Sequence, residues 1–572
     1  MEKRGKYKMI FYDFEVFKYD WLVVLINPEK KTKDVIVNNP EKLKSYYESN
    51  KADIWVGYNS RNYDQFILKG ILCGFDPYNI SNFVINQDQS GYRFSSLMNK
   101  IQLYNYDVMT SMHGLKQLEG FMGNNIKETS VPFDLDRKLT ENELEETIKY
   151  CTHDVEQTIE VFIKRIDEFN AVLSLINTFE LPISYIGKTK AQLSAIILGC
   201  NKKSRDDEWD IQLIDTLKIK KYRNIVNWFL DKSNYDYSKS LEADVAGIPH
   251  TFGWGGLHGA REKYHGTGLI IHVDVNSFYP AIMIEYGLLT RNCNNPDKYR
   301  QIRDYRLELK KQGKKKEQAP YKIVLNATYG ICKDKYSLAY DPRQANNICI
   351  NGQLLLLDLI EHLESIQGFE LIQSNTDGLI VKIPNTDGAF EQLDDICYEW
   401  ETRTRMGLGF DYIKWISQKD VNNYIFEFDN GKLERKGAYV KDLSDLDNDL
   451  PIINKALVDY LAKEIPVETT INNCNDLIEY QKIVKVSNKF LAGVYGGQIL
   501  SDKTFRVFAS KDIKDGYIGK IKALGATVEK FANTPDNCFI WNESVVGVKV
   551  PNKLDKQWYI DLAKKRLEDF GV

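Results

Sequence analysis

Short apolar runs, typical of β-strands, dominate the beginning of the chain. Tyr7 to Asp13 (YKMIFYD) is one such run, and Trp21 to Ile26 (WLVVLI) is a second that ends before Asn27-Pro28. A third short strand is predicted from Ile54 to Tyr58. These runs predict a sheet formed by the N-terminal residues.

A helical repeat follows from Glu141 to Ile163. Its apolar residues recur at spacings of three and four, which places them on one face of a helix. They are Leu144, Ile148, Cys151, Val155, Ile159 and Phe162. Strands combined with a long helix predict that residues 1–190 form an α/β domain.

A second block of structure begins with the apolar run Leu269 to Val273 (LIIHV). This run has the pattern of a buried strand and ends at Asp274. Pro320 to Ile331 is predicted to be helical. Phe369 to Ile383 is predicted to be a hairpin whose turn is Asn375-Thr376-Asp377-Gly378. The two blocks together predict a multidomain α/β protein.

Composition narrows the class of protein. A chain of 572 residues is too long for one hydrophobic core, so we expect three or more lobes. The fractions of 43% hydrophobic and 27% charged residues are typical of soluble proteins. We find no apolar run long enough to cross a membrane, and the basic stretch Met1 to Lys8 lacks the apolar segment of a signal peptide. Nine cysteines without a CxxC pair argue against a zinc knuckle or a disulfide framework and favour a cytoplasmic protein.

The formal net charge of −4 is unusual for a protein that binds nucleic acid. A metal-dependent nuclease or polymerase can have such a charge, because it gathers carboxylates in its active sites and places lysine and arginine along a channel. One dense basic run is present: Lys310, Lys311, Lys314, Lys315 and Lys316. Taken alone, this run is typical of a solvated surface.

Carboxylates near the N-terminus have the spacing of a metal site. Asp13 and Glu15 lie at positions i and i+2 of a predicted strand, so both side chains point to the same face. In isolation this pair is equally typical of an exposed strand edge. The segment Asn59 to Asp64 follows, and then Tyr150 and Asp154, which are one helical turn apart.

The three segments read Asp-x-Glu, Asn-x3-Tyr-Asp and Tyr-x3-Asp. In this order they resemble the exonuclease motifs of the proofreading domains of family B DNA polymerases, which are DEDDy-type enzymes with an RNase H-like fold. The metal ligands that the resemblance implies are Asp13, Glu15, Asp64 and Asp154. Tyr150 would orient the attacking water, and Asn59 and Tyr63 would contact the single-stranded primer end. Lys127, in the sequence IKET, loosely matches a lysine that aids catalysis in phage members.

The sequence DVNSFYP, which starts at Asp274, resembles polymerase motif A, Asp-x-x-Ser-Leu-Tyr-Pro, with Phe in place of Leu. The resemblance implies that Asp274 and the backbone carbonyl of Val275 bind metal. It also implies contacts with the incoming nucleotide from Ser277, Phe278 and Tyr279. Tyr279 would stack under the sugar and exclude a ribose 2′-hydroxyl, whereas its alternative role is core packing.

A stripe of polar residues lies along the predicted helix that follows. Lys322, Asn326 and Tyr329 share one face at i, i+4 and i+7. The segment resembles motif B, Lys-x3-Asn-Ser-x-Tyr-Gly, with Ala in place of Ser, and this implies that the stripe faces the incoming nucleotide. Lys322 would supply positive charge to the triphosphate. Arg306 and Lys310, spaced by four on the preceding predicted helix, would complete the phosphate clamp.

The hairpin turn stands where motif C, Tyr-x-Asp-Thr-Asp-Ser, is expected. Asn375 replaces the first Asp of the motif and Gly378 replaces its Ser, whereas Asp377 keeps the second Asp. The resemblance implies that the second Asp is the direct metal ligand. We therefore expect Asp274 and Asp377 to form an active metal pair, with Asn375 near the nucleotide. The alternative is a degenerate, slow polymerase.

Two further segments resemble motifs that contact DNA. Gly255 and Gly256, in FGWGGLHG, stand where a Tyr-x-Gly-Gly linker motif is expected, and glycines let the backbone approach the template strand. A plain turn explains them equally well. Lys436 and Tyr439, in RKGAY, resemble a Lys-x-Tyr motif that grips the primer terminus, with one extra residue.

The order of these motifs implies an exonuclease domain followed by a right-hand polymerase. The predicted domains are an RNase H-like exonuclease (1–190), the N-terminal part of the palm (191–297), the fingers (298–338), the C-terminal part of the palm (339–450) and a thumb (451–572). Only 48 positions separate Asp274 from Lys322. The large insertions of protein-primed phage polymerases have no room there, so we predict extension of a nucleic-acid primer.

The predicted function is template-directed DNA synthesis from dNTPs, with 3′→5′ proofreading, in phage genome replication in the cytoplasm of a bacterial host. Two Mg²⁺ or Mn²⁺ ions are expected in each active site. The expected partners are a DNA primer-template and dNTPs, with a helicase, a clamp or a single-strand-binding protein as accessory factors, and the chain is expected to be a monomer. Two alternatives remain open: an exonuclease with a weak or vestigial polymerase site, and a non-enzymatic DNA-binding replication factor.

Overall fold

Residues 8–572 are described by a computed structural model, and the chain divides into two units. Unit 1 consists of Met1–Lys188, Leu443–Ile452 and Asn472–Tyr559. Unit 2 consists of Thr189–Asp442, Ile453–Ile471 and Ile560–Val572. Both units mix helices and strands, so the fold is a multidomain α/β fold. Among residues 8–572, none of the helices combines the length and the hydrophobicity that crossing a lipid bilayer requires.

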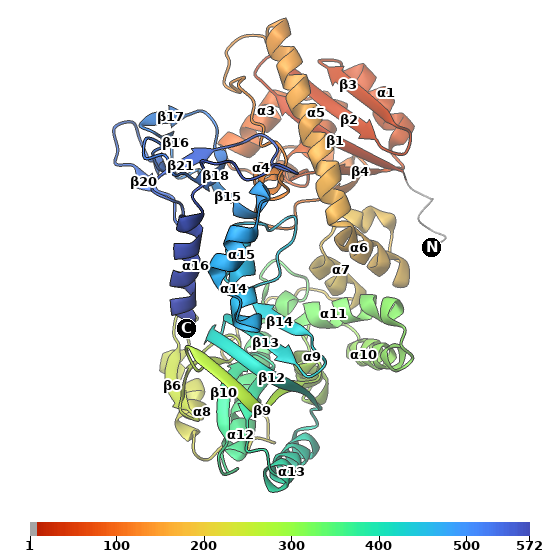
Figure 1. Ribbon diagram of the computed structural model, residues 1–572. Helices are drawn as coiled ribbons and strands as arrows, with labels where there is room; N and C mark the ends of the chain where they lie inside the picture. Colours follow the sequence, from red (N-terminus) through yellow and green to blue (C-terminus); the bar gives the residue numbers. More distant parts are fainter. Residues whose placement is uncertain (1–7) are drawn as a thin grey trace. The chain divides into compact units, whose positions relative to one another are not determined.

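A five-stranded sheet lies at the centre of unit 1 (Figure 1). In the spatial order β3-β2-β1-β4-β5, its strands are β1 (Met9–Val16), β2 (Trp21–Asn27), β3 (Thr32–Val37), β4 (Ile54–Gly57) and β5 (Tyr104–Asp107). Strand β1 is antiparallel to β2 and parallel to β4. Most side chains on both faces of β1 and β2 are buried, which explains why these runs are almost continuously apolar.

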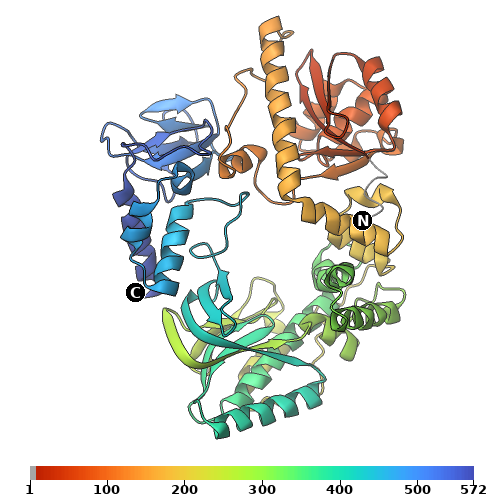
Figure 2. The same ribbon diagram turned by 45° about the vertical axis from the view of Figure 1, so that its right-hand side comes forward.

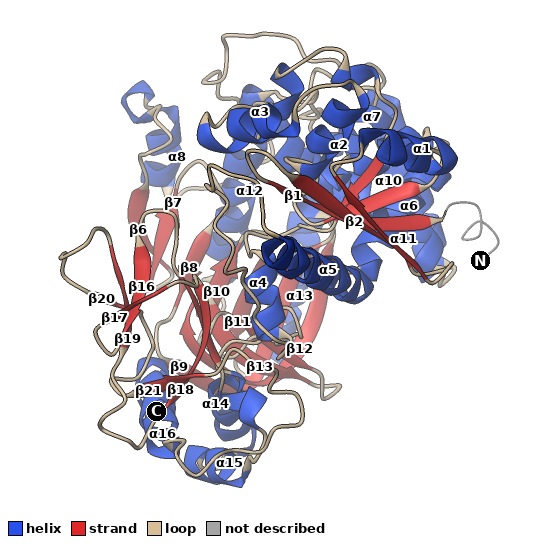
Figure 3. Cartoon of the chain, turned by 90° about the horizontal axis from the view of Figure 1, so that it is seen from above, coloured by secondary structure: helices blue, strands red, loops and turns tan. Residues whose placement is uncertain are grey.

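The helices of this part of unit 1 pack on the sheet or beside it. They are α1 (Pro40–Asn50), α2 (Asp64–Leu72), α3 (Pro77–Ser81), α4 (Leu115–Phe121), α5 (Glu141–Lys164) and α6 (Ile166–Thr178). Figure 3 shows α5 against β1 and β2. A capping box starts α5: the hydroxyl of Thr140 accepts a hydrogen bond from the N–H of Glu143, whose carboxylate in turn accepts the Thr140 N–H.

The later part of unit 1, Asn472–Tyr559, forms two small antiparallel sheets. The first has the order β15-β18-β21, and the second has the order β17-β16-β19-β20. Their strands are β15 (Lys482–Lys485), β16 (Ala492–Tyr495), β17 (Gln498–Leu500), β18 (Thr504–Ala509), β19 (Ile518–Ile521), β20 (Glu529–Lys530) and β21 (Cys538–Ile540). Apolar side chains such as Val484, Phe505 and Ile518 fill a shared core.

Arg506, on β18, attaches this part of unit 1 to the end of α4. Its side chain is fully buried, and one guanidinium nitrogen donates hydrogen bonds to the carbonyls of Gly120 (3.1 Å) and Asn124 (2.7 Å). Its Nε donates to the side chain of Gln481 (3.0 Å). A buried guanidinium is costly unless its N–H groups are bonded. These bonds therefore fix the end of α4.

An antiparallel nine-stranded sheet forms the centre of unit 2. Its order is β14-β13-β12-β9-β11-β10-β8-β7-β6. Its strands are β6 (Leu241–Val245), β7 (Ile248–Phe252), β8 (His258–Ala260), β9 (Tyr264–Val275), β10 (Glu370–Asn375), β11 (Gly378–Lys382), β12 (Leu408–Asp420), β13 (Asn423–Phe428) and β14 (Leu433–Lys436). Strand β9 lies between β12 and β11, which places Asp274 opposite Gly409 on one side and Gly378 on the other.

Helices flank this sheet. They are α7 (Lys190–Ile197), α8 (Arg223–Leu230), α9 (Phe278–Glu285), α10 (Pro296–Lys311), α11 (Lys315–Lys333), α12 (Pro342–Leu363) and α13 (Asp387–Thr404). Figure 2 shows α12 and α13 on one face of the sheet. In three C-terminal helices the chain passes from one unit to the other: α14 (Pro451–Lys463), α15 (Val467–Asn473) and α16 (Lys556–Phe570).

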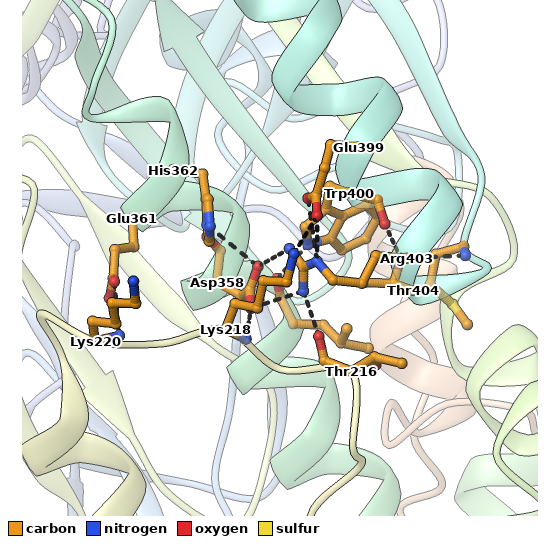
Figure 4. A network of polar contacts seen from close by, with 12 residues as sticks. Thr216, Lys218, Lys220, Asp358, Glu361, His362, Glu399, Trp400, Arg403 and Thr404 are labelled. Atoms are coloured by element: carbon orange, nitrogen blue, oxygen red, sulfur yellow. Dashed lines mark hydrogen bonds and ion pairs between the residues drawn. The ribbon is translucent and has the colours of Figure 1, made fainter.

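Polar side chains of α12 hold the extended segment 210–222 of unit 2. The amide oxygens of Asn347 and Asn351 accept backbone N–H groups of this segment. Further along α12, the fully buried Asp358 accepts the N–H of Lys218 and forms an ion pair with Arg403 at 2.7 Å (Figure 4). Since a buried carboxylate requires such partners, this network fixes the segment that leads to β6.

The predicted elements of both blocks are confirmed, with small shifts of their ends. The first predicted strand becomes β1, although Tyr7, where the prediction begins, lies outside the described residues. The predicted hairpin is β10 and β11. The predicted helix at Pro320 begins earlier, at Lys315. Proline favours the first turn of a helix, and that preference shifted the predicted start.

Candidate active sites

Three elements of unit 1 bring together four carboxylates. We call these four residues the first cluster: Asp13, Glu15, Asp64 and Asp154. Strand β1 presents Asp13 and Glu15 on one face. Asp64 starts α2, and its carboxylate accepts a hydrogen bond from the N–H of Phe14 on β1 at 3.1 Å. Asp154 reaches the same place from α5, where its charge raises the pKa values of Asp13 and Glu15.

The first cluster is buried. The exposed fractions are 7% for Glu15, 3% for Asp64 and 8% for Asp154. Burial, and then the neighbouring carboxylates, raise the pKa values of Asp13 and Glu15 well above their usual range. Burial also raises the pKa of Asp64 to about 7 and that of Asp154 to about 6. Buried like charges of this kind need a cation between them, and carboxylate oxygens suit Mg²⁺ or Mn²⁺. Ligand atoms of Asp13, Glu15 and Cys151 lie within 4.8 Å of one another, so this part of the cluster can hold a divalent ion.

Lys116 on α4, rather than Lys127, contacts the first cluster. Its ammonium group donates to the carboxylate of Asp154, and also to Glu119 at 3.1 Å. Lys127 is exposed, and its backbone N–H donates to Glu119 at 3.3 Å. Sequence reasoning missed Lys116. The only signal was its spacing of three from Glu119 on a short helix.

Tyr150 lies beside the cluster. The Lys116 ammonium is 4.6 Å from the centre of its ring. Burial, followed by the charge of Asp154, raises the pKa of its hydroxyl. The Tyr150 hydroxyl therefore remains protonated and can hydrogen-bond a water molecule.

The two residues of unit 1 that were predicted to bind DNA lie in different surroundings. Asn59 is exposed, and its N–H donates to Asp107 at 2.9 Å. Tyr63 donates its hydroxyl to Ser81 at 2.9 Å. It also lines a pocket of about 340 Å³ that Glu15 borders. The pocket adjoins the first cluster directly.

The second cluster consists of Asp274, Asp377 and Asp411 in unit 2. Asp274 stands near the end of β9, and Asp377 occupies the turn between β10 and β11. The N–H of Val275 donates to the carbonyl of Asp377 at 2.8 Å, which joins the turn to β9. Burial, followed by the charges of Asp377 and Asp411, raises the pKa of Asp274 to about 6. Asp377 is more exposed, but partial desolvation also raises its pKa.

Asp411 was not predicted from the sequence. It lies on β12 opposite His272, two positions from the residue that pairs with Asp274. It therefore points to the same face of the sheet as Asp274. The signal was a carboxylate inside the apolar strand pattern LGFDYIKW. Asp411 therefore adds a third negative charge beside Asp274 and Asp377.

A pocket of about 390 Å³ opens beside the second cluster. Ten of its lining residues are predicted site residues: Asp274, Val275, Ser277, Phe278, Tyr279, Arg306, Lys310, Lys322, Asn326 and Asp377. The carboxylates are on β9 and the hairpin turn, whereas the cationic residues come from α10 and α11. The pocket thus places negative and positive groups where a metal-bound triphosphate requires them.

Arg306 is held in place within this pocket. One of its terminal guanidinium nitrogens donates to the hydroxyl of Ser277 (3.0 Å), and its Nε donates to Gln318 (3.2 Å). The rings of Tyr279 and Tyr329 pack with their centres 4.6 Å apart, so Tyr329 supports Tyr279 from behind. The predicted stripe of motif B is therefore split: Lys322 and Asn326 line the pocket, and Tyr329 packs against one of its walls.

A second pocket of about 810 Å³ borders the other side of the second cluster. Asn375 and Lys436 line it. Tyr439, the other residue predicted to contact the primer, donates its hydroxyl to Asp569 at 2.9 Å. Lys436 thus lies near the second cluster, while Tyr439 contacts the C-terminal residues of unit 2.

The two glycines of the predicted linker motif differ from each other. A Cβ atom at Gly256 would lie 2.8 Å from the hydroxyl of Thr376, on the hairpin turn. At Gly255, a Cβ atom would meet nothing within 4 Å.

The chain is 22% identical over 294 residues to "DNA polymerase 1" of Sulfurisphaera ohwakuensis, covering 43% of this chain and 32% of that protein. It is 23% identical over 209 residues to "DNA polymerase 1" of Sulfolobus acidocaldarius, covering 35% of this chain and 22% of that protein. The chain thus matches no more than about a third of the length of these curated relatives. No protein-family model matches it.

Among solved structures, the chain is similar to the family B DNA polymerase of Pyrobaculum calidifontis. The TM-score is 0.43 and the sequence identity is 12%. The match covers 99% of this chain and 77% of the other.

Proposed function

We propose that this chain is a template-directed DNA polymerase with a 3′→5′ proofreading exonuclease. The observation that carries the proposal is the pocket of about 390 Å³ in unit 2, where Asp274 and Asp377 face Arg306, Lys310 and Lys322. The partial similarity to DNA polymerases supports the same reaction. In this proposal unit 2 contains the palm and the fingers, and bacteriophage genome replication is the role.

In the synthetic site, Asp274, Asp377 and Asp411 would hold two divalent ions, with the carbonyl of Val275 as a further ligand. The ions would supply electrostatic stabilisation to the attacking and leaving oxygens. Arg306, Lys310 and Lys322 would bind the triphosphate. Tyr279, supported by Tyr329, would form the floor under the sugar.

In the hydrolytic site, Asp13, Glu15, Asp64 and Asp154 would hold the ions for cleavage of the primer's last phosphodiester. Lys116 would orient Asp154 and offset part of its negative charge. The protonated hydroxyl of Tyr150 would position the attacking water. The pocket that Tyr63 and Glu15 line would receive the terminal nucleotide.

A second candidate function is a 3′→5′ exonuclease with a weak polymerase site. Asn375 favours it, because an amide replaces the carboxylate that the resemblance places at this position. Asp411 favours an active polymerase site, because it adds a third carboxylate to the second cluster.

Primer extension and primer degradation with Mg²⁺ test both candidates. We expect Asp274→Ala to remove nucleotide incorporation and to spare degradation, and Asp13→Ala to do the reverse. The expected loss is ~10³-fold or more, as for removal of a metal ligand at a reacting centre. A wild-type chain that degrades primers but incorporates no nucleotide would favour the exonuclease alone. Loss of both activities in either variant would contradict two separate sites.

A further inference from the structure

The hairpin turn that carries Asp377 has an unfavourable backbone conformation. Asn375 pairs with Gly378, so Thr376 and Asp377 are the two turn residues. Thr376 has φ 56°, in the left-handed region. This region is unfavourable for a β-branched residue. The turn keeps this shape only if its surroundings hold it.

The segment that begins at Gly256 supplies those contacts. The N–H of Thr376 donates to the carbonyl of Leu257 at 2.8 Å. Next to it, Asn375 pairs with His258 across β10 and β8. Gly256 lies directly against Thr376: an added Cβ would be 2.8 Å from the hydroxyl oxygen and 3.3 Å from the methyl carbon. A residue larger than glycine at this position would meet the side chain of Thr376, which would have to rotate or move together with the turn.

The opposite side of the turn is fixed to β9. The carbonyl of Asp377 accepts the N–H of Val275, the neighbour of Asp274. If the new methyl group moves the backbone of Thr376, this bond to β9 is strained and Asp377 moves relative to Asp274. Metal ligands tolerate little displacement, and loss of the groups that orient them typically costs 10–100-fold in metal affinity or activity.

We propose that Gly256 is a positioning residue for the second cluster. Because it has no side chain, the Thr376–Asp377 turn can pack closely against it, and this packing sets the separation of Asp377 from Asp274. From the sequence, Gly255 and Gly256 were explained together, either by close approach to the template strand or by a plain turn. Their surroundings separate them, because position 256 is filled by the turn and position 255 is open. This inference rests on the proposed synthetic site.

The experiment compares Gly256→Ala with Gly253→Ala in the full chain. Gly253 lies in the same segment, and a Cβ there would be 3.6 Å from the carbonyl of Lys239, an ordinary contact. We expect Gly256→Ala to weaken Mn²⁺ binding, followed by electron paramagnetic resonance, by ~10-fold or more, and to raise the half-saturating Mg²⁺ for primer extension in parallel. Asp274→Ala identifies which part of the Mn²⁺ signal belongs to the second cluster. Primer degradation and the melting temperature report whether the variants fold.

A second substitution provides a rescue. Thr376→Gly removes both atoms that the new methyl group would meet and suits a positive φ. The double variant Gly256→Ala with Thr376→Gly is therefore expected to regain most of the Mn²⁺ affinity, as a coupling between adjacent residues. A surface or folding effect of Gly256→Ala would not be reversed by a change at the turn.

The outcomes separate the inference from the proposed function. Unchanged Mn²⁺ affinity in Gly256→Ala, or no recovery in the double variant, overturns the positioning role. Weaker binding of primer-template with unchanged metal affinity also overturns it and makes Gly256 a DNA contact. Failure of the polymerase proposal has a different signature: a wild-type chain that binds Mn²⁺ through Asp274 but extends no primer.

Discussion

The two carboxylate clusters contain the same chemical groups in different surroundings. In the first cluster, three of the four carboxylates are less than 10% exposed, and Lys116 contacts Asp154 directly. In the second cluster, Asp377 and Asp411 are exposed, Asp274 is half-buried, and the cationic residues stand across a pocket of about 390 Å³. The first cluster therefore has a built-in counter-charge and the second has space for a substrate.

This difference matches the two proposed reactions. Hydrolysis needs room for a water molecule and one phosphodiester, so a buried site with strong electrostatics suits it. Synthesis needs space for a nucleoside triphosphate, whose negative charge Arg306, Lys310 and Lys322 on the other side of the pocket can neutralise. Variants that change the counter-charge of the first cluster, or the number of carboxylates in the second, test this difference.

The largest effect is expected from removal of the built-in counter-charge. Lys116→Met should slow primer degradation by ~10²–10³-fold, because Asp154 loses its buried partner and Tyr150 loses the cation beside its ring. Primer extension should stay within about twofold of wild type. Single-turnover degradation of a 3′-labelled primer measures both the rate and its dependence on Mg²⁺.

Two other lysines sharpen this test. The sequence-based prediction requires Lys127→Met to lose more degradation activity than Lys116→Met, and that order would refute the role given to Lys116. Lys149, which is 65% exposed on α5 and paired with Glu145, is the matched control for a charge lost near the same helix. Its replacement by methionine is expected to have no effect on degradation.

Lys116 also shows where prediction from sequence stops. The spacing of Asp13 and Glu15 on a strand, and the turn at Asp377, were predictable because they depend on neighbouring residues. The contact of Lys116 depends on the place of α4, which Arg506 holds from almost 400 positions away in the chain. Local patterns contain no information about such a contact.

The same limit applies in unit 2. Asp411 joins the second cluster only because β12 pairs with β9 in one register. Tyr439 was predicted to contact the primer, yet its hydroxyl is bonded to Asp569, 130 positions further along the chain. The motif spacing placed Lys436 near the cluster but carried no signal for this long-range partner.

An intermediate effect is expected from Asp411→Asn. This change keeps the shape of the side chain and removes one charge from the second cluster. Because Asp411 raises the pKa of Asp274, we expect the pKa of Asp274 to fall and Mg²⁺ binding to weaken, with primer extension slower by about 10-fold. Extension rates measured over a Mg²⁺ titration test this.

The control for Asp411 is Asp395→Asn, an exposed residue on α13. A loss as large as that of Asp274→Ala would make Asp411 a principal ligand. A rate equal to that of the Asp395 control would remove Asp411 from the site and restore the case for a weak polymerase with Asn375.

The smallest effect is a pH dependence of stability that differs between the clusters. In the metal-free chain, Asp64 has a pKa of about 7, whereas an unfolded Asp titrates near ~4. The folded state therefore binds more protons between about pH 4 and 7, so the stability of unit 1 falls as pH rises through this window and is level above it. Asp64→Asn removes this buried negative charge, whose pKa is raised first by burial and then by the charge of Asp107. We expect it to raise the metal-free melting temperature of unit 1 by about 2–4 °C at pH 8 and to change it little at pH 5, as for a gain of about 1 kcal/mol.

Divalent ions should reverse this behaviour, because they bind the ionised carboxylates. Mn²⁺ is expected to raise the melting temperature of the wild-type unit 1 more at pH 8 than at pH 5.5, and to lose this effect in Asp64→Asn. For Asp274 the pH window ends lower, at about pH 6. Its carboxylate is half-exposed, so solvent screens its repulsion from Asp377 and Asp411. Asp274→Asn should therefore change the metal-free melting temperature less than Asp64→Asn. Scanning calorimetry measures these melting temperatures, in EDTA at pH 5 and pH 8 and in Mn²⁺ at pH 5.5 and pH 8. An equal stabilisation by Asp64→Asn at pH 5 and pH 8 would mean that the buried negative charge of Asp64 does not destabilise the metal-free protein. The contrast between a buried and an open site would then lose its electrostatic basis.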